Sequence, residues 1–247
     1  MARICIVNVG VNTKHEPLRS PRLPDGRFEF VPIPEEVLNR VECPRAPRYR
    51  DLHPVTDLPV EAFIPRTRLS QLMHNDPEFS TFTYGDYLRR PRAANIARLT
   101  RGDMLLFYAR LVEWKNGFTR RAGFYFVGRF MVDRIYGPIK ERPPASVLRR
   151  IRRNMHIIRG ECDRSQYDGF WVVKGSQKST RYEIAVPFNR KLIEKCRLRD
   201  SRGRPIRWSR FGTELRTIGT YFRAARLIAD KDVVERLRDH VEDRAFE

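Results

Sequence analysis

MLLFYARLV (residues 104–112) is followed, after the polar loop EWKNGFTRR, by AGFYFVGRFMVDRIY (residues 122–136). Both stretches are rich in aromatic and β-branched residues, and apolar side chains stand at consecutive positions rather than only at alternate ones. Such runs are typical of strands that are buried on both faces. The sequence therefore predicts that the two stretches form adjacent antiparallel strands, joined as a hairpin, at the centre of a sheet.

The regions on either side of this hairpin predict the rest of a mixed fold. An apolar run at 3–9, ended by Gly10, indicates a buried opening strand. Two more strands are expected at 170–174 and 180–188, and helices are expected at 91–99, 144–156, 221–228 and 232–244. From 41 to 65 prolines recur too often for a regular helix, but the aromatic and aliphatic residues between them predict that this excursion packs on the core.

Strands thus gather in the middle of the chain and helices towards its end. This order favours one α+β domain over residues 1–247 rather than a repeating βαβ fold. Its expected form is a central mixed, mostly antiparallel, curved sheet with helices in the C-terminal part. The order of GDMLLFY (102–108) and GFYFVGRF (123–130) also fits a small curved barrel.

The chain is strongly basic, with 49 lysines and arginines against 30 aspartates and glutamates, a formal net charge of +19 and an isoelectric point near 10.5. Of the basic residues, 41 are arginine, whose planar and permanently charged group fits phosphate. A polyanion is therefore the expected partner, and nucleic acid or a nucleotide is the preferred one. The alternative is a solvated, ion-paired surface, which would explain arginine over lysine but not the surplus of positive charge.

Four cysteines, at 5, 43, 162 and 196, stand without a CxxC motif or a zinc-binding spacing. We therefore expect no structural disulfide, no metal site and a reducing, cytoplasmic location. No apolar run is long enough to cross a bilayer, so no membrane association is expected.

Several common catalytic signatures are missing from the sequence. It contains no P-loop motif, no GxGxxG after the first strand, no HExxH, no GxSxG and no zinc deaminase pattern. P-loop hydrolases, dinucleotide-binding enzymes of the usual kind and the hydrolases that carry these motifs are therefore disfavoured.

The segment HNDPEFSTFTYGD (74–86) contains no lysine, no arginine and no aliphatic side chain, although arginine recurs every few residues elsewhere. His74 can take up or release a proton near neutral pH, and Asp76 and Asp86 can act as bases. These three residues are the predicted catalytic groups of one concave site. The alternative is structural, with Asp76 turning the chain before Pro77 and Asp86 belonging to a second turn.

Binding contacts are predicted around these groups. A base edge can pair with the amide of an asparagine, its face can stack on an aromatic ring, and arginines at the rim can hold phosphates. The predicted binding residues are Asn75, Phe82, Tyr84, Asn95, Arg19, Arg92, Arg110, Lys174 and Ser176. For any single residue the structural explanation is preferred: Arg92 taken alone is expected to face solvent, and His156 is expected to cap or pack at a helix end. A plain hairpin turn explains the glycine of KGSQKS (174–179) as well as a phosphate-holding loop does.

The order of several unusual blocks resembles the nucleotide modification associated domain 3 family. The blocks are VNVGVN, LRSP, DGRFEFVPIPE, YRDL, HNDPEFSTFTYGD, PRAANIARLTRGDMLLFYARL, GFYFVGRF, NMH, FWVVKGSQKS, YEIAVPF and IGTYFRAARLI, and together they extend over nearly the whole chain. The family is grouped with systems that make or handle modified bases in DNA. The resemblance therefore implies DNA in preference to RNA, but it implies no reaction, cofactor or oligomeric state.

Three functions remain open on this basis. The protein recognises or modifies a nucleobase in DNA, or it is a non-catalytic reader module, or it is a metal-dependent nuclease. The first two differ in whether His74 meets an acid at hydrogen-bond distance around an enclosed cavity. A nuclease would need carboxylates that converge from separate strands, for which Asp76, Asp86 and Glu29 are candidates.

Overall fold

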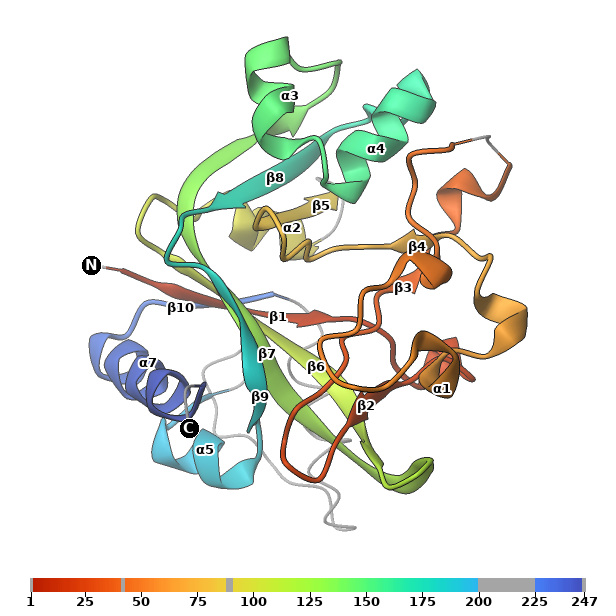
Figure 1. The fold of residues 1–247 in the computed structure, drawn as a ribbon. Coiled ribbons are helices and arrows are strands. Elements are labelled where there is room, and N and C mark those ends of the chain that lie inside the picture. Colours follow the sequence, from red (N-terminus) through yellow and green to blue (C-terminus); the bar gives the residue numbers. More distant parts are fainter. Residues whose placement is uncertain (1, 41–42, 88–90, 200–224, 246–247) are drawn as a thin grey trace.

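The computed structural model describes residues 2–40, 43–87, 91–199 and 225–245. A single α+β domain is built on one mixed sheet that curls like half a barrel, with helices around it (Figure 1). As far as the described residues go, its strands are β1 (Ile4–Val9), β2 (Ser20–Arg22), β5 (Thr83–Tyr87), β6 (Met104–Trp114), β7 (Phe118–Ile139), β8 (Phe170–Gly175), β9 (Thr180–Pro187) and β10 (Arg226–Ile228). A separate small sheet pairs β3 (Ile33–Pro34) with β4 (Met73–His74). The predicted fold class is confirmed.

The predicted central hairpin is also confirmed. β6 and β7 pair antiparallel, from Met104 opposite Met131 to Trp114 opposite Phe118. β1 and β2 pair parallel with the other edge of β6, and β8 and β9 pair antiparallel with the other edge of β7. Most of β6 is buried, as expected of a strand that lies between two others and is covered on both faces.

β7 is 22 residues long and serves two neighbours in turn. Its residues 125–129 pair with β9, and its residues 132–139 pair with β8. β5 follows β8 at the end of the strand order, so that β6, β7 and β8 stand between it and β1. Because the sheet curls along β7, β5 nevertheless comes back towards the end of β1, and the two strands line one cavity.

The described helices lie around the sheet (Figure 1). They are α1 (Val60–Phe63), α2 (Pro91–Ile96), α3 (Ala145–Ile151), α4 (Met155–Cys162), α5 (Arg190–Lys195) and α7 (Lys231–Ala245), with 3-10 turns at Thr13–His15, Val37–Arg40, Tyr49–Asp51, Arg66–Arg68 and Arg164–Gln166. α3 and α4 pack on β8 through a small core that includes Leu148, Ile157 and Phe170. Within the described ranges, none of the helices is both long enough and apolar enough to cross a membrane.

Three of the predicted helices are wrong in part. The helix expected at 144–156 is split into α3 and α4, because the side chain of Asn154 accepts from the backbone N–H of His156 and so begins a new helix. Of the helix expected at 221–228, residues 226–228 instead form the strand β10, which pairs antiparallel with β1. Residues 221–224 lie outside the described residues. A helix at these residues would leave the backbone groups on the outer edge of β1 unpaired, whereas β10 satisfies them by hydrogen bonding. α2 stops at Ile96, short of the predicted 91–99.

The proline-rich excursion packs on the core, as predicted. In its described part, Tyr49, Phe63 and Ile64 are buried in one apolar cluster. The hydroxyl of Tyr49 donates to the carbonyl of Pro32, immediately before β3, at 2.9 Å. The excursion therefore supports the short β3–β4 pair, which carries part of the candidate site.

Asp103, immediately before β6, anchors the start of β1. Its carboxylate accepts hydrogen bonds from the backbone N–H and the guanidinium of Arg3 at 2.6–3.1 Å, and from the backbone N–H of Thr100 at 2.7 Å. The residue is only 2% exposed. Burial opposes its ionisation, but the hydrogen bonds from Arg3 and Thr100 outweigh burial and hold the pKa of Asp103 below the ordinary 3.8.

We expect Asp103→Asn to lower the free energy of unfolding by about 1–3 kcal/mol at neutral pH, because it removes a buried charge-assisted network. Since the folded pKa lies below the unfolded one, the stabilisation by ionised Asp103 is present above pH 3.8 and disappears as the pH falls through the folded value. Urea unfolding at several pH values should therefore show a difference between wild type and variant that shrinks in acid.

The control is Asp133→Asn, which removes a pair between half-buried Asp133 and exposed Arg101 at 3.5 Å and should cost less than about 1 kcal/mol. Equal losses for the two variants, or a loss for Asp103→Asn that does not change with pH, would contradict this role of Asp103.

Candidate functional site

The candidate site lies where the segment between β4 and β5 meets β1 and α4. In the β3–β4 pair Ile33 stands opposite His74, so Glu35, just beyond β3, comes beside His74. A cavity of about 380 Å³ opens here, lined by residues from the end of β1 and the loop after it (8–15), from the β4–β5 region and from α4. We call it the histidine pocket, after His74 and His156.

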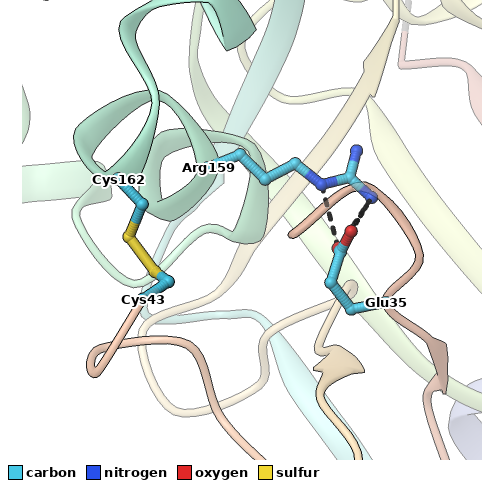
Figure 2. Close-up of a disulfide and its surroundings, with 4 residues drawn as sticks. All are labelled: Glu35, Cys43, Arg159 and Cys162. Carbon is cyan, nitrogen blue, oxygen red and sulfur yellow. Dashed lines mark hydrogen bonds and ion pairs between the residues drawn. A yellow bond between two sulfur atoms is a disulfide. The ribbon is translucent and has the colours of Figure 1, made fainter. Parts of the chain in front are cut away.

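His74 is oriented by a buried ion pair. Its Nδ1 lies 2.9 Å from Oε2 of Glu35, which is fully buried. Arg159 of α4 donates to both oxygens of Glu35, from Nε and Nη2, each at 2.9 Å (Figure 2). Burial alone would raise the pKa of Glu35, but the hydrogen bond from His74 and the charge of Arg159 lower it to about 2. An ionised carboxylate only accepts, so Nδ1 of His74 carries the proton that is shared with Glu35.

Asp76 lies on the other side of His74. Its Oδ2 accepts from the backbone N–H of Gly85 at 2.8 Å and from Nδ2 of Asn154 at 3.5 Å. The same oxygen is 3.9 Å from Nε2 of His74 and 3.6 Å from Nε2 of His156. Its Oδ1 is buried and has no hydrogen-bond partner among the described residues. Burial, the largest effect, raises the pKa of Asp76 well above its ordinary value.

A glycine in β5 lets the start of α4 approach this carboxylate. A Cβ atom added to Gly85 would lie 2.5 Å from Cδ2 of His156 and 3.0 Å from Oδ1 of Asn154. The missing side chain therefore makes room for His156, whose ring meets that of His74 edge to face at a centroid distance of 5.1 Å. The result is two imidazoles and one carboxylate at one end of the pocket.

The structure brings together four of the residues predicted from the segment 74–86. His74, Asp76, Tyr84 and Asp86 all line the histidine pocket. Tyr84 is 5% exposed, and much of its ring packs in the core against Phe107, at a centroid distance of 5.3 Å. Their catalytic and binding roles stay predictions.

Asn75 faces away from the histidine pocket. It lines a second cavity of about 600 Å³, which has basic side chains in its wall. We call this space the arginine cavity, after Arg45, Arg152, Arg153 and Arg181. The chain between β4 and β5 thus divides the two cavities, with His74 and Asp76 on one side and Asn75 and Ser80 on the other.

Two more predicted contacts have structural partners. Phe82 packs its ring on Phe130 in the core, with the centroids 5.6 Å apart. Asn95 donates from Nδ2 to the carbonyl of Ala225 at 2.7 Å and so ties α2 to the residue before β10. Neither side chain belongs to the lining of the histidine pocket.

The predicted cationic rim is also placed differently. Arg19 pairs with Glu16 at 2.6 Å, and burial lowers the pKa of Arg110 on β6, but neither lines the pocket. Arg92 lies in α2, and its side chain is outside the described residues.

Lys174 donates to the carbonyl of Thr81, and Oγ of Ser176 accepts from a backbone N–H in its own loop at 3.2 Å. The exposed cation at the pocket is instead Lys14.

Sequence reasoning missed the partners that complete the site. No local pattern in the sequence points to Glu35 or Arg159, and the pattern around His156 predicts only capping or packing. The contact between His74 and Glu35 spans 39 residues, and that between Arg159 and Glu35 spans 124. The only local signal was the pair Asn154 and His156 at a helix start, which the structure uses for both capping and the pocket.

The expectation of unpaired cysteines is wrong for two of the four. Cys43 and Cys162 form a disulfide across 119 residues, with a Cα–Cα distance of 5.5 Å (Figure 2). Sequence spacing could not reveal this pair, because the fold alone brings the two residues together. The disulfide ties the loop before residue 49 to the end of α4, the helix that carries His156 and Arg159. Cys5 and Cys196 are free and buried, and the cytoplasmic location stays a prediction.

Comparison with known proteins identified one relationship. The family model described as nucleotide modification associated domain 3 matches residues 3–211. No curated protein and no solved structure matched the chain. The matched range contains all the residues that line the histidine pocket, from Asn8 to Arg159.

We expect Glu35→Gln to lower the free energy of unfolding by about 3–5 kcal/mol, because it leaves Arg159 buried without a counter-ion. The matched control is Glu36→Gln, at the exposed neighbouring position, which should change stability by no more than about 0.5 kcal/mol. Urea unfolding of both variants measures the difference. If the two variants are equally stable, the ion pair does not support the site.

Proposed function

The chain belongs to the nucleotide modification associated domain 3 family, and on that premise we propose that it binds a nucleotide unit of DNA in the histidine pocket and acts on its base. A cavity of about 380 Å³ falls within the range of roughly 300–1,000 Å³ that is usual for small-molecule sites. The pocket is large enough for a nucleoside but not for a duplex, so the base would enter from a single strand or turned out of its helix.

The observation that carries the proposal is the reactive cluster at one end of the pocket. His74, held by Glu35 at 2.9 Å, faces Asp76 and His156. Burying a carboxylate beside two imidazoles costs desolvation free energy, and a module that only reads a base edge needs amides and aromatic rings instead. The cluster therefore favours a base-modifying enzyme over a non-catalytic reader, which is the second candidate.

The rest of the pocket supplies groups suited to a nucleotide. Tyr87 presents aromatic surface, and Asn8 brings an amide to the lining. Asp86, also in the lining, offers a carboxylate that can accept from an exocyclic amino group. Lys14, exposed at the pocket, is placed for a phosphate.

The arginine cavity supports DNA as the larger ligand. Its basic wall lies across the segment 75–80 from the histidine pocket, and the chain carries a net charge of +19. Backbone phosphates held by arginine would place a strand beside the pocket without specifying its sequence. A nuclease built on Asp76, Asp86 and Glu29 is less favoured, because Glu29 lines the arginine cavity and accepts from Thr56 at 2.6 Å.

We expect deoxynucleoside monophosphates to bind the purified protein, as measured by isothermal titration calorimetry. His74→Gln should weaken binding of the monophosphate and of the parent nucleoside alike, by about tenfold for loss of one hydrogen bond. Lys14→Ala should weaken binding of the monophosphate only. Lys191→Ala, an exposed lysine on α5, is the matched control and should bind as the wild type does.

A single-stranded DNA oligonucleotide should bind with an affinity that falls steeply as salt rises, because each neutralised phosphate releases counter-ions. Fluorescence anisotropy over a salt series measures this, and mass spectrometry of nucleosides recovered from the incubated DNA reports a change in the base. If neither the oligonucleotide nor any monophosphate binds at low salt, the proposed function is wrong. If His74→Gln leaves binding unchanged, the ligand does not bind in the histidine pocket.

A further inference from the structure

Three potential metal ligands converge in the histidine pocket. They are a ring nitrogen of His74, a ring nitrogen of His156 and a carboxylate oxygen of Asp76, and these atoms all lie within 4.8 Å of one another. Each comes from a different part of the chain: β4, the turn after it and α4. All three residues are buried, so their convergence is set by the core and not by mobile surface side chains.

We propose that His74, Asp76 and His156 bind one divalent transition-metal ion in the histidine pocket. Zinc bonds of about 2.0–2.2 Å to nitrogen and oxygen place neighbouring ligands of a tetrahedron roughly 3.4 Å apart. The nitrogen–oxygen distances here are 3.6 Å from His156 Nε2 and 3.9 Å from His74 Nε2, both to Asp76 Oδ2. The three ligand atoms lie within 4.8 Å of one another, so the ligands, the two imidazoles above all, would have to move closer together to close the site around an ion.

The surroundings of His74 match those of a metal-bound imidazole. Histidine ligands usually donate their other ring N–H to a carboxylate or carbonyl group, which fixes the tautomer and the ring orientation. His74 donates from Nδ1 to Oε2 of Glu35, at 2.9 Å. Both oxygens of Glu35 in turn accept from Arg159. This leaves Nε2, the atom nearer Asp76, to face the ion.

The unsatisfied oxygen of Asp76 is a second, independent observation. Asp76 Oδ1 is buried and, within the described part of the chain, no donor reaches it. A buried carboxylate oxygen without a donor is costly. A cation bound by both carboxylate oxygens would satisfy Oδ1, whereas a hydrophobic ligand in the pocket would not.

The ligand set points to the class of ion. Two imidazoles and one carboxylate suit zinc, iron(II) and related first-row ions, while magnesium and calcium prefer sites made of oxygen atoms. Three protein ligands leave at least one coordination position open, and here the open side faces the cavity. That arrangement is typical of catalytic rather than structural metal sites.

The inference goes beyond the proposed function and does not depend on it, because the three residues could hold an ion whether or not a nucleotide binds. The two proposals share His74, Asp76 and His156, so a nucleotide titration alone would not separate them. Metal alone is therefore the probe, and its binding is measured without nucleotide.

The test is titration of the metal-depleted full chain with Zn²⁺ by isothermal titration calorimetry, with bound metal counted by mass spectrometry after desalting. We expect one ion per chain and a rise in the temperature of unfolding on binding. Replacing a residue that only supports a metal ligand costs 10–100-fold in affinity, so His74→Gln, His156→Gln and Asp76→Asn should each weaken binding by about 100-fold or more.

His53→Gln is the matched control, because this histidine is exposed and lies in the arginine cavity; it should bind Zn²⁺ as the wild type does. Circular dichroism of the metal-free proteins checks folding, and the near-isosteric Asp76→Asn carries the test if a histidine variant fails to fold. A wild type that takes up no Zn²⁺, or an Asp76→Asn variant that binds it as tightly as the wild type, would overturn the proposal.

Discussion

The buried ion pair between Glu35 and Arg159 is the interaction on which the candidate site depends. It joins the end of β3 to the middle of α4, two segments 124 residues apart in sequence. A buried pair of this kind contributes little net stability, but breaking it is costly because one charge is left without a partner. Its structural effect is to hold the ring of His74 in one orientation and one tautomer, and so to decide which nitrogen faces the cavity.

The curl of the sheet supplies the second constraint. The long strand β7 changes neighbours along its length, from β9 to β8, and this turns β5 back towards the end of β1. Gly85 on β5 then accepts the close approach of His156, at a distance that no side chain would allow. The histidine pocket is therefore a product of the whole sheet, and the disulfide between Cys43 and Cys162 further fastens α4 to the loop beside it.

What the sequence predicts and what it misses follows from the range of the interactions. The hairpin of β6 and β7 and the opening strand β1 are visible because their apolar patterns are local. Residues 74–86 are visible as a candidate site for the same reason, since their unusual composition is contiguous. Glu35, Arg159 and the disulfide are invisible because each depends on a contact between distant segments, and β10 replaces a locally plausible helix because it pairs with β1.

A crystal structure of the protein grown with a deoxynucleoside monophosphate tests the central claim most directly, because the histidine pocket and the arginine cavity are separate sites that share one segment of chain. We expect the base in the histidine pocket, beside His74 and Asp76, with the phosphate towards Lys14. A monophosphate bound only in the arginine cavity, with the histidine pocket untouched by the ligand, would contradict a role for the His74 cluster in nucleotide chemistry.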